Sequence, residues 1–174
     1  MKYFIYILFF LLIVVTSMTT CIKEKNFSPI PAIVFERYVS YVSNNNLGTP
    51  NDDSAYCYIK FKDGDGDIGF LAGDTTTLTD LTMKYWYKST DGTFLPRDSK
   101  PATLAMDTLF YTYRVPNITP DGQYKALDGE ITIKLRTQPL YYPSDKVVKF
   151  DIILTDRAGH KSNMVETNEI NVNP

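Results

Sequence analysis

Residues 54–62 have the sequence SAYCYIKFK, in which two kinds of side chain alternate. Small or apolar side chains occupy the odd positions, and tyrosine or lysine occupies the even positions from 56 onward. Because successive residues of a β-strand point to opposite faces, this period of two predicts a strand with one face in the core. Cys57 lies on the apolar face, so we expect it to pack in the core and not to react.

The same alternation recurs along most of the chain. It predicts further strands at residues 33–42, 81–88, 93–97, 108–115, 130–136, 147–155 and 161–172, the last with a break near Asn168. Thirteen tyrosines and ten phenylalanines favour strands, and no segment predicts a long, capped helix. We therefore expect an all-β fold, an antiparallel two-sheet sandwich of seven or eight strands with Ig-like topology. A small closed barrel is the alternative.

The first 20 residues predict an export signal. Lys2 precedes an uninterrupted apolar run at residues 3–15, and the small or polar residues 16–20 (TSMTT) lead to Cys21. The apolar run is shorter than the roughly 20 residues that cross a bilayer, and its length suits a signal peptide.

The segment TSMTTC at residues 16–21 resembles the lipobox of bacterial lipoproteins, in the looser form found in Bacteroidota. Met18 stands where leucine is usual, and Thr20 replaces glycine or alanine. The resemblance implies that Cys21 carries a diacylglycerol and an acylated amino terminus. The expected location is then the outer membrane of a bacterial cell envelope, facing the periplasm or the cell surface. Ordinary cleavage without lipid, or an uncleaved anchor, is the alternative.

Residues 21–31 predict a tether between this anchor and a single domain at residues 32–174. The segment IKEKNFSPIP is polar and contains two prolines, so we expect it to be extended and solvated. If lipid occupies Cys21, Cys57 is the only free thiol. An intramolecular disulfide is then impossible, and the fold must rest on its core alone.

The charge balance argues against a nucleic-acid partner. Loss of Lys2 with the signal peptide changes the net charge from −2 to −3, and no basic patch with interleaved aromatic residues occurs.

Residues 63–69, DGDGDIG, place three carboxylates at alternate positions separated by glycines. Ca²⁺ takes six to eight oxygen ligands, and glycine lets a tight loop turn its carboxylates inward. Asp63, Asp65 and Asp67 are therefore candidate Ca²⁺ ligands. The loop is not an EF-hand, because Ile68 stands where that motif needs glycine and neither flank predicts a helix. The alternative is a solvated Asp-Gly turn without a cation.

The expected topology adds Asp156 to this candidate site. In an Ig-like sandwich, the loop after the second strand and the loop after the sixth strand share one end. The DGDGD loop follows residues 54–62, and Asp156 follows the strand at residues 147–155. We therefore expect Asp156 to approach Asp63, Asp65 and Asp67.

Two segments carry further resemblances. FKDGDGDIGF at residues 61–70 resembles a recurrent segment of uncharacterised Bacteroidota lipoproteins with Ig-like domains. FDIILTDRAGHKSN at residues 150–163 resembles the last hairpin of many bacterial Ig-like domains, with His160 in place of asparagine. Both resemblances imply a fold, and neither implies a known reaction.

The sequence favours a non-catalytic binding or accessory module over an enzyme. His160 is the only histidine, it lies in an expected turn, and no nucleophile elbow or phosphate-binding loop occurs. The strand at residues 85–87 (YWY) has one face that could stack on a sugar, so a glycan or an envelope protein is a candidate partner. A purely structural module and a glycan-acting enzyme are the alternatives.

Overall fold

The structure is a computed structural model that describes residues 26–44, 50–71, 73, 80–97, 110–119, 125–135 and 144–172, together with Tyr3. The predictions of a signal peptide and of lipid on Cys21 therefore lie outside the described residues. Within the described part of the chain, no helix is both long enough and apolar enough to cross a membrane.

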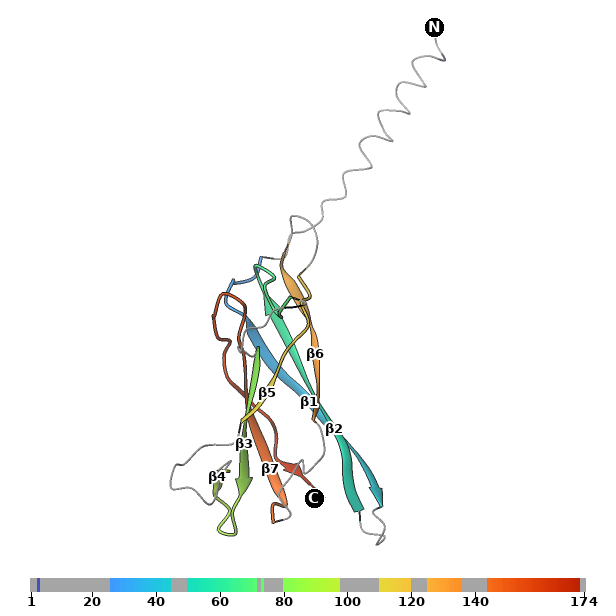
Figure 1. The fold of residues 1–174 in the computed structure, drawn as a ribbon, viewed down its shortest axis with the longest axis vertical. Coiled ribbons are helices and arrows are strands. Elements are labelled where there is room, and N and C mark those ends of the chain that lie inside the picture. Colours follow the sequence, from blue (N-terminus) through green and yellow to red (C-terminus); the bar gives the residue numbers. More distant parts are fainter. Residues whose placement is uncertain are drawn as a thin grey trace.

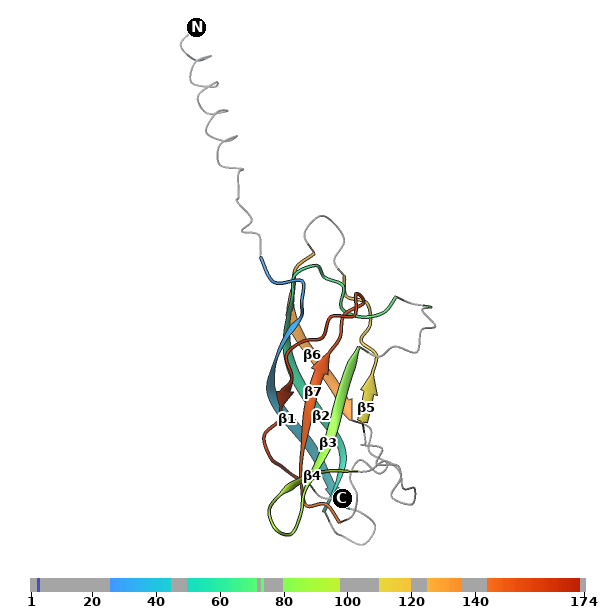
Figure 2. The ribbon, with the colours of Figure 1, turned by 90° about the vertical axis from the view of Figure 1, so that its left-hand side faces the viewer.

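The described strands form two antiparallel sheets (Figure 1). The first sheet has the order β1-β2-β6 and contains β1 (Ala32–Asn44), β2 (Pro50–Asp63) and β6 (Leu127–Leu135). The second sheet contains β3 (Leu81–Lys88), β4 (Phe94–Pro96), β5 (Phe110–Tyr113), β7 (Val147–Leu154), β8 (Val165–Glu166) and β9 (Ile170–Asn171). Figure 2 shows β3 and β7 in front of the first sheet. The predicted all-β sandwich is confirmed, since the described strands form two separate sheets and not a closed barrel.

Part of the strand order agrees with the predicted Ig-like arrangement. Strands β1 and β2 share one sheet with the later strand β6, as expected, whereas both β4 and β5 pair with β3 in the other sheet. Strand β3 pairs with β7, which pairs in turn with β8 and β9. The last predicted strand is interrupted at residues 167–169, as expected near Asn168.

Strand β3 carries two short partners on its outer edge. Strand β4 pairs with the end of β3, at Trp86–Lys88, and β5 pairs with its start, at Leu81–Lys84. Pro96 lies in β4 at the sheet edge, where a residue without an N–H group is tolerated.

The core is formed by the inward faces of β2, β3 and β7. The fully buried hydrophobic residues on these faces are Ala55, Cys57, Ile59, Leu81, Met83, Tyr85, Val148, Phe150, Ile152 and Leu154. The rings of Tyr85 and Phe150 pack edge to face with their centroids 5.5 Å apart. The Tyr85 hydroxyl donates a 2.9 Å hydrogen bond to Asp145, so its polar atom is satisfied inside the protein. Burial raises the pKa of the Cys57 thiol to about 12, which agrees with an unreactive core cysteine.

The last part of the predicted tether reaches the domain. Residues 26 and 28–30 are exposed, as expected for a tether, whereas Pro31 is buried and Phe27 is half-buried.

We expect Phe150→Ala to lower the free energy of unfolding by about 3–5 kcal/mol, because it removes a large ring from the centre of the core. Met164→Ala, at a residue that is 60% exposed, is the control and should change it by less than about 0.5 kcal/mol. Urea unfolding followed by circular dichroism measures both values. Equal effects of the two substitutions would mean that Phe150 does not lie in the core.

Candidate metal centre

Three carboxylates gather where β2 ends. Ligand oxygens of Asp63, Asp65 and Asp67 lie within 4.8 Å of one another. Asp63 is the last residue of β2 and continues the inward alternation after Ile59 and Phe61, so its side chain is fully buried. The candidate site is therefore partly inside the sandwich and not only in an exposed turn.

The loop is shaped by hydrogen bonds to one oxygen of Asp63. Its Oδ2 accepts the N–H groups of Gly66 at 2.7 Å and of Asp67 at 3.1 Å. Gly66 has φ +70°, a conformation that favours glycine, and Ile68 is fully buried and anchors the end of the loop. These contacts would also stabilise an Asp-Gly turn that binds no cation.

The other oxygens of the cluster favour a cation. Among the described residues, neither Asp63 Oδ1 nor Asp67 Oδ1 has a hydrogen-bond partner, although both atoms are buried. A buried carboxylate oxygen without a donor is costly, because it has lost its contacts with water. A cation bound between these oxygens would replace those contacts, and carboxylate oxygens are the ligands that Ca²⁺ takes.

Asp63 and Asp67 have raised pKa values in the absence of a cation. Burial, followed by repulsion from Asp65, raises the pKa of Asp63 from its ordinary value of 3.8 to about 6. Burial, followed by repulsion from Asp156 and Asp65, also raises the pKa of Asp67. The site therefore disfavours its own negative charge, which a bound cation would stabilise.

The loop after β7 packs directly on this site, as the topology predicted. The backbone N–H of Arg157 donates to the carbonyl oxygen of Asp67 at 3.2 Å, and that of Ala158 donates to Asp67 Oδ2 at 3.0 Å. The sequence correctly predicted that the two loops meet.

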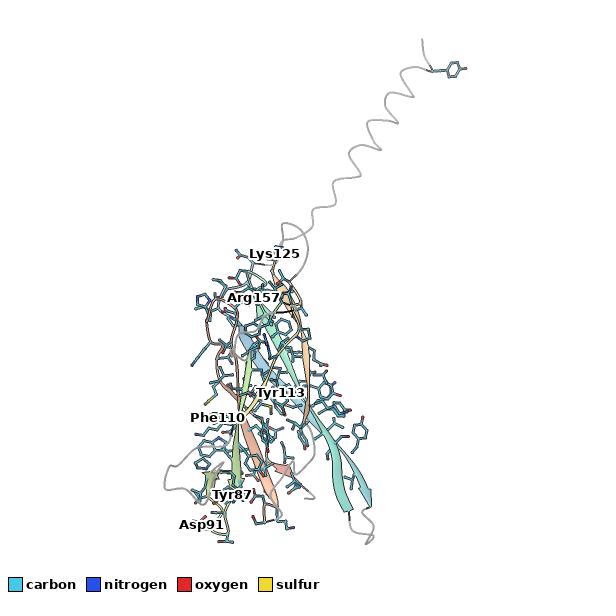
Figure 3. All side chains as sticks on the ribbon, in the orientation of Figure 1. Tyr87, Asp91, Phe110, Tyr113, Lys125 and Arg157 are labelled. Carbon is cyan, nitrogen blue, oxygen red and sulfur yellow. The ribbon has the colours of Figure 1, made fainter. Side chains whose placement is uncertain are left out.

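Arg157 was not singled out from the sequence, yet it ties this end of the sandwich together. Its guanidinium donates to the carbonyl oxygen of Gly69, to Asn117 Oδ1 at 2.9 Å and to Thr119 Oγ1 at 2.8 Å. Figure 3 shows Arg157 at the opposite end of the sandwich from Asp91. No sequence signal marks it, because its acceptors come from loops whose approach depends on the tertiary fold.

Asp156 lies beside Asp67 but outside the cluster of three carboxylates. Its Oδ1 accepts the backbone N–H of His160 at 2.7 Å, and its Oδ2 lies 2.9 Å from His160 Nδ1. Gly159 donates its N–H to the Asp156 carbonyl oxygen, which closes the predicted turn around His160. Both carboxylate oxygens of Asp156 thus have partners, and its role as a direct ligand stays a prediction.

The outer face of β3 offers little free aromatic surface. Lys84 Nζ lies 3.9 Å from the centroid of the Trp86 ring, and Trp86 Nε1 donates to Asp151 at 2.7 Å. A sugar that stacked on the same side as Lys84 would have to displace this cation.

Comparison of the chain with known proteins found no matching family model, curated protein or solved structure.

In a cation-free protein, Asp63 should make the free energy of unfolding fall as pH rises from about 4 to about 6. Over that range the folded state retains a proton that the unfolded state has released, because the pKa of Asp63 is 3.8 before folding and about 6 after it. The loss should be on the order of 2 kcal/mol. Urea unfolding in the presence of a chelator at pH 4 and pH 7 measures it.

Asp63→Asn is the informative variant, because it keeps the shape of the side chain and cannot ionise. Its free energy of unfolding should fall less than that of the unaltered protein between these two pH values. An identical fall in both proteins would show that Asp63 does not titrate in this way.

Proposed function

We propose that this chain is a lipid-anchored protein of a bacterial cell envelope that serves as a non-catalytic binding or accessory module and binds Ca²⁺ through Asp63, Asp65 and Asp67. Ca²⁺ binding is supported above all by two buried oxygens, Asp63 Oδ1 and Asp67 Oδ1, which have no hydrogen-bond donor within the described residues. Support for the location comes from the lipobox-like segment that ends at Cys21.

The donor set supports a hard cation. The clustered ligands are carboxylates, and Cys57 is buried elsewhere, in the core. Zinc sites use mainly thiolate and imidazole ligands, whereas calcium sites use carboxylates, carbonyl groups and water. Mg²⁺ is the less suitable ion, because it demands near-ideal octahedral geometry and keeps most of its water.

The positions of the other polar groups support a non-catalytic role. The contact between Asp156 and His160 resembles the base and orienting acid of a catalytic triad, but no nucleophile is shown bonded to the histidine among the described residues. Glu36 and Glu169 line a groove of about 410 Å³ between β1 and β9. Each of them forms a 2.9 Å ion pair with a lysine, Glu36 with Lys60 and Glu169 with Lys88, which favours a structural role for both.

Calorimetric titration of the mature chain with Ca²⁺ should show one binding site, and millimolar Ca²⁺ should raise the melting temperature. Binding at 100 times the Kd would add about 2.7 kcal/mol to the free energy of unfolding. The double variant Asp63→Asn with Asp67→Asn should lose both the heat of binding and the rise in melting temperature, because it removes two of the three charges.

Asp91→Asn is the matched control for this titration. Asp91 also precedes a glycine with positive φ, in an exposed turn at the other end of the sandwich (Figure 3). This variant should bind Ca²⁺ as the unaltered chain does. The proposal is wrong if the unaltered chain shows neither heat nor stabilisation, or if Asp91→Asn loses as much binding as the double variant.

A further inference from the structure

The chain enters the sandwich directly beside the candidate metal centre. Gly64 lies between Asp63 and Asp65, and a side-chain carbon at this position would lie less than 3 Å from the carbonyl oxygens of Phe27 and Ser28. Only glycine, which has no such carbon, permits this approach. The absence of a side chain at Gly64 is thus required by the segment that precedes β1, and not only by the turn itself.

Three further contacts hold this segment and the start of β1 at the same end of the sandwich. Asn163, from the loop after β7, accepts the N–H of Ile33 and donates to its carbonyl oxygen, both at 2.9 Å. Lys62 Nζ lies 5.4 Å from the centroid of the Phe27 ring, and Pro31 is buried. Figures 1 and 2 show the blue segment before β1 joining the sandwich at this end.

Two backbone carbonyl groups lie beside the loop that carries the three carboxylates. The atoms nearest to a side-chain carbon at Gly64 would be the carbonyl oxygens of Phe27 and Ser28, both at less than 3 Å. Backbone carbonyl oxygens are ordinary Ca²⁺ ligands, so a cation bound at this loop can take them beside the carboxylates.

We propose that the cation at Asp63, Asp65 and Asp67 clamps residues 27–31 to the sandwich, with the carbonyl groups of Phe27 and Ser28 completing its oxygen environment. This inference rests on the proposed function, since it requires that the three aspartates bind Ca²⁺. Ca²⁺ then rigidifies the junction between the tether and the domain. With lipid on Cys21, the six residue-to-residue steps from Cys21 to Phe27 span at most about 20 Å, so the clamp would fix the orientation of the domain close to the membrane.

Limited trypsin digestion of the mature chain tests the clamp, with cleavage after Lys25 followed by mass spectrometry. A protease needs an extended stretch of several residues around the cleaved bond, so residues 27 and 28 must leave the loop before Lys25 can be cut. We expect cleavage at least five-fold slower in millimolar Ca²⁺ than in a chelator. The double variant Asp63→Asn with Asp67→Asn should lose this protection, and Asp91→Asn should keep it.

Gly64→Ala separates the clamp from the metal site, because its side chain collides with the two carbonyl groups while all three aspartates are retained. We expect this variant to bind Ca²⁺ at least five-fold more weakly and to lose the protection of Lys25. Gly92→Ala is the control. A side chain there meets no atom within 4 Å, and the strain of its φ of +88° falls in an exposed turn far from the three aspartates, so this variant should retain both properties.

The outcomes distinguish this inference from the function on which it rests. Ca²⁺ binding without protection of Lys25, or equal Ca²⁺ affinity in Gly64→Ala and Gly92→Ala, overturns the clamp and leaves the proposed metal site intact. Absence of Ca²⁺ binding overturns both.

Discussion

The alternation along β2 places the carboxylate of Asp63 inside the protein, and the organisation of this end of the sandwich depends on that placement. One oxygen of Asp63 is satisfied by the N–H groups of Gly66 and Asp67, which fold the loop back on itself. The other oxygen is buried and finds no donor within the described residues. Asp67 repeats this arrangement, because its Oδ2 accepts a bond from Ala158 while its Oδ1 has no partner there. Each of these two carboxylates thus has one oxygen that is hydrogen-bonded to the protein and one that is not. A cation would bind the second oxygen of both.

Much of the fold could be predicted from residue periodicity. The strand predicted at residues 81–88 coincides with β3, because its alternation is uninterrupted and Asp-Gly turn residues follow it. The prediction for residues 93–97 gave an edge strand, and β4 pairs there with the end of β3. Periodicity could not predict that β5 would join the same edge of β3, since pairing between distant strands depends on the whole sheet and not on local pattern.

The sequence predicted which aspartates form the candidate site, but not how deeply they are buried or which other residues contact them. The spacing of Asp63, Asp65 and Asp67 indicated a cluster, and Ig-like topology predicted that the loop after β7 would meet it. The sequence could not distinguish a solvated turn from a buried one, because the burial of Asp63 depends on how distant parts of the chain pack around it. The contacts of Arg157 and the approach of Phe27 to Gly64 also depend on tertiary packing. The site thus joins three parts of the chain that are distant in sequence.

A cation bound between the unsatisfied oxygens of Asp63 and Asp67 would be visible in a crystal structure of the mature chain grown with Ca²⁺, through its anomalous diffraction. The proposed metal site requires an anomalous peak about 2.3–2.6 Å from Asp63 Oδ1 and from Asp67 Oδ1. Both oxygens bonded instead to water or to protein N–H groups, with no anomalous peak between them, would contradict it.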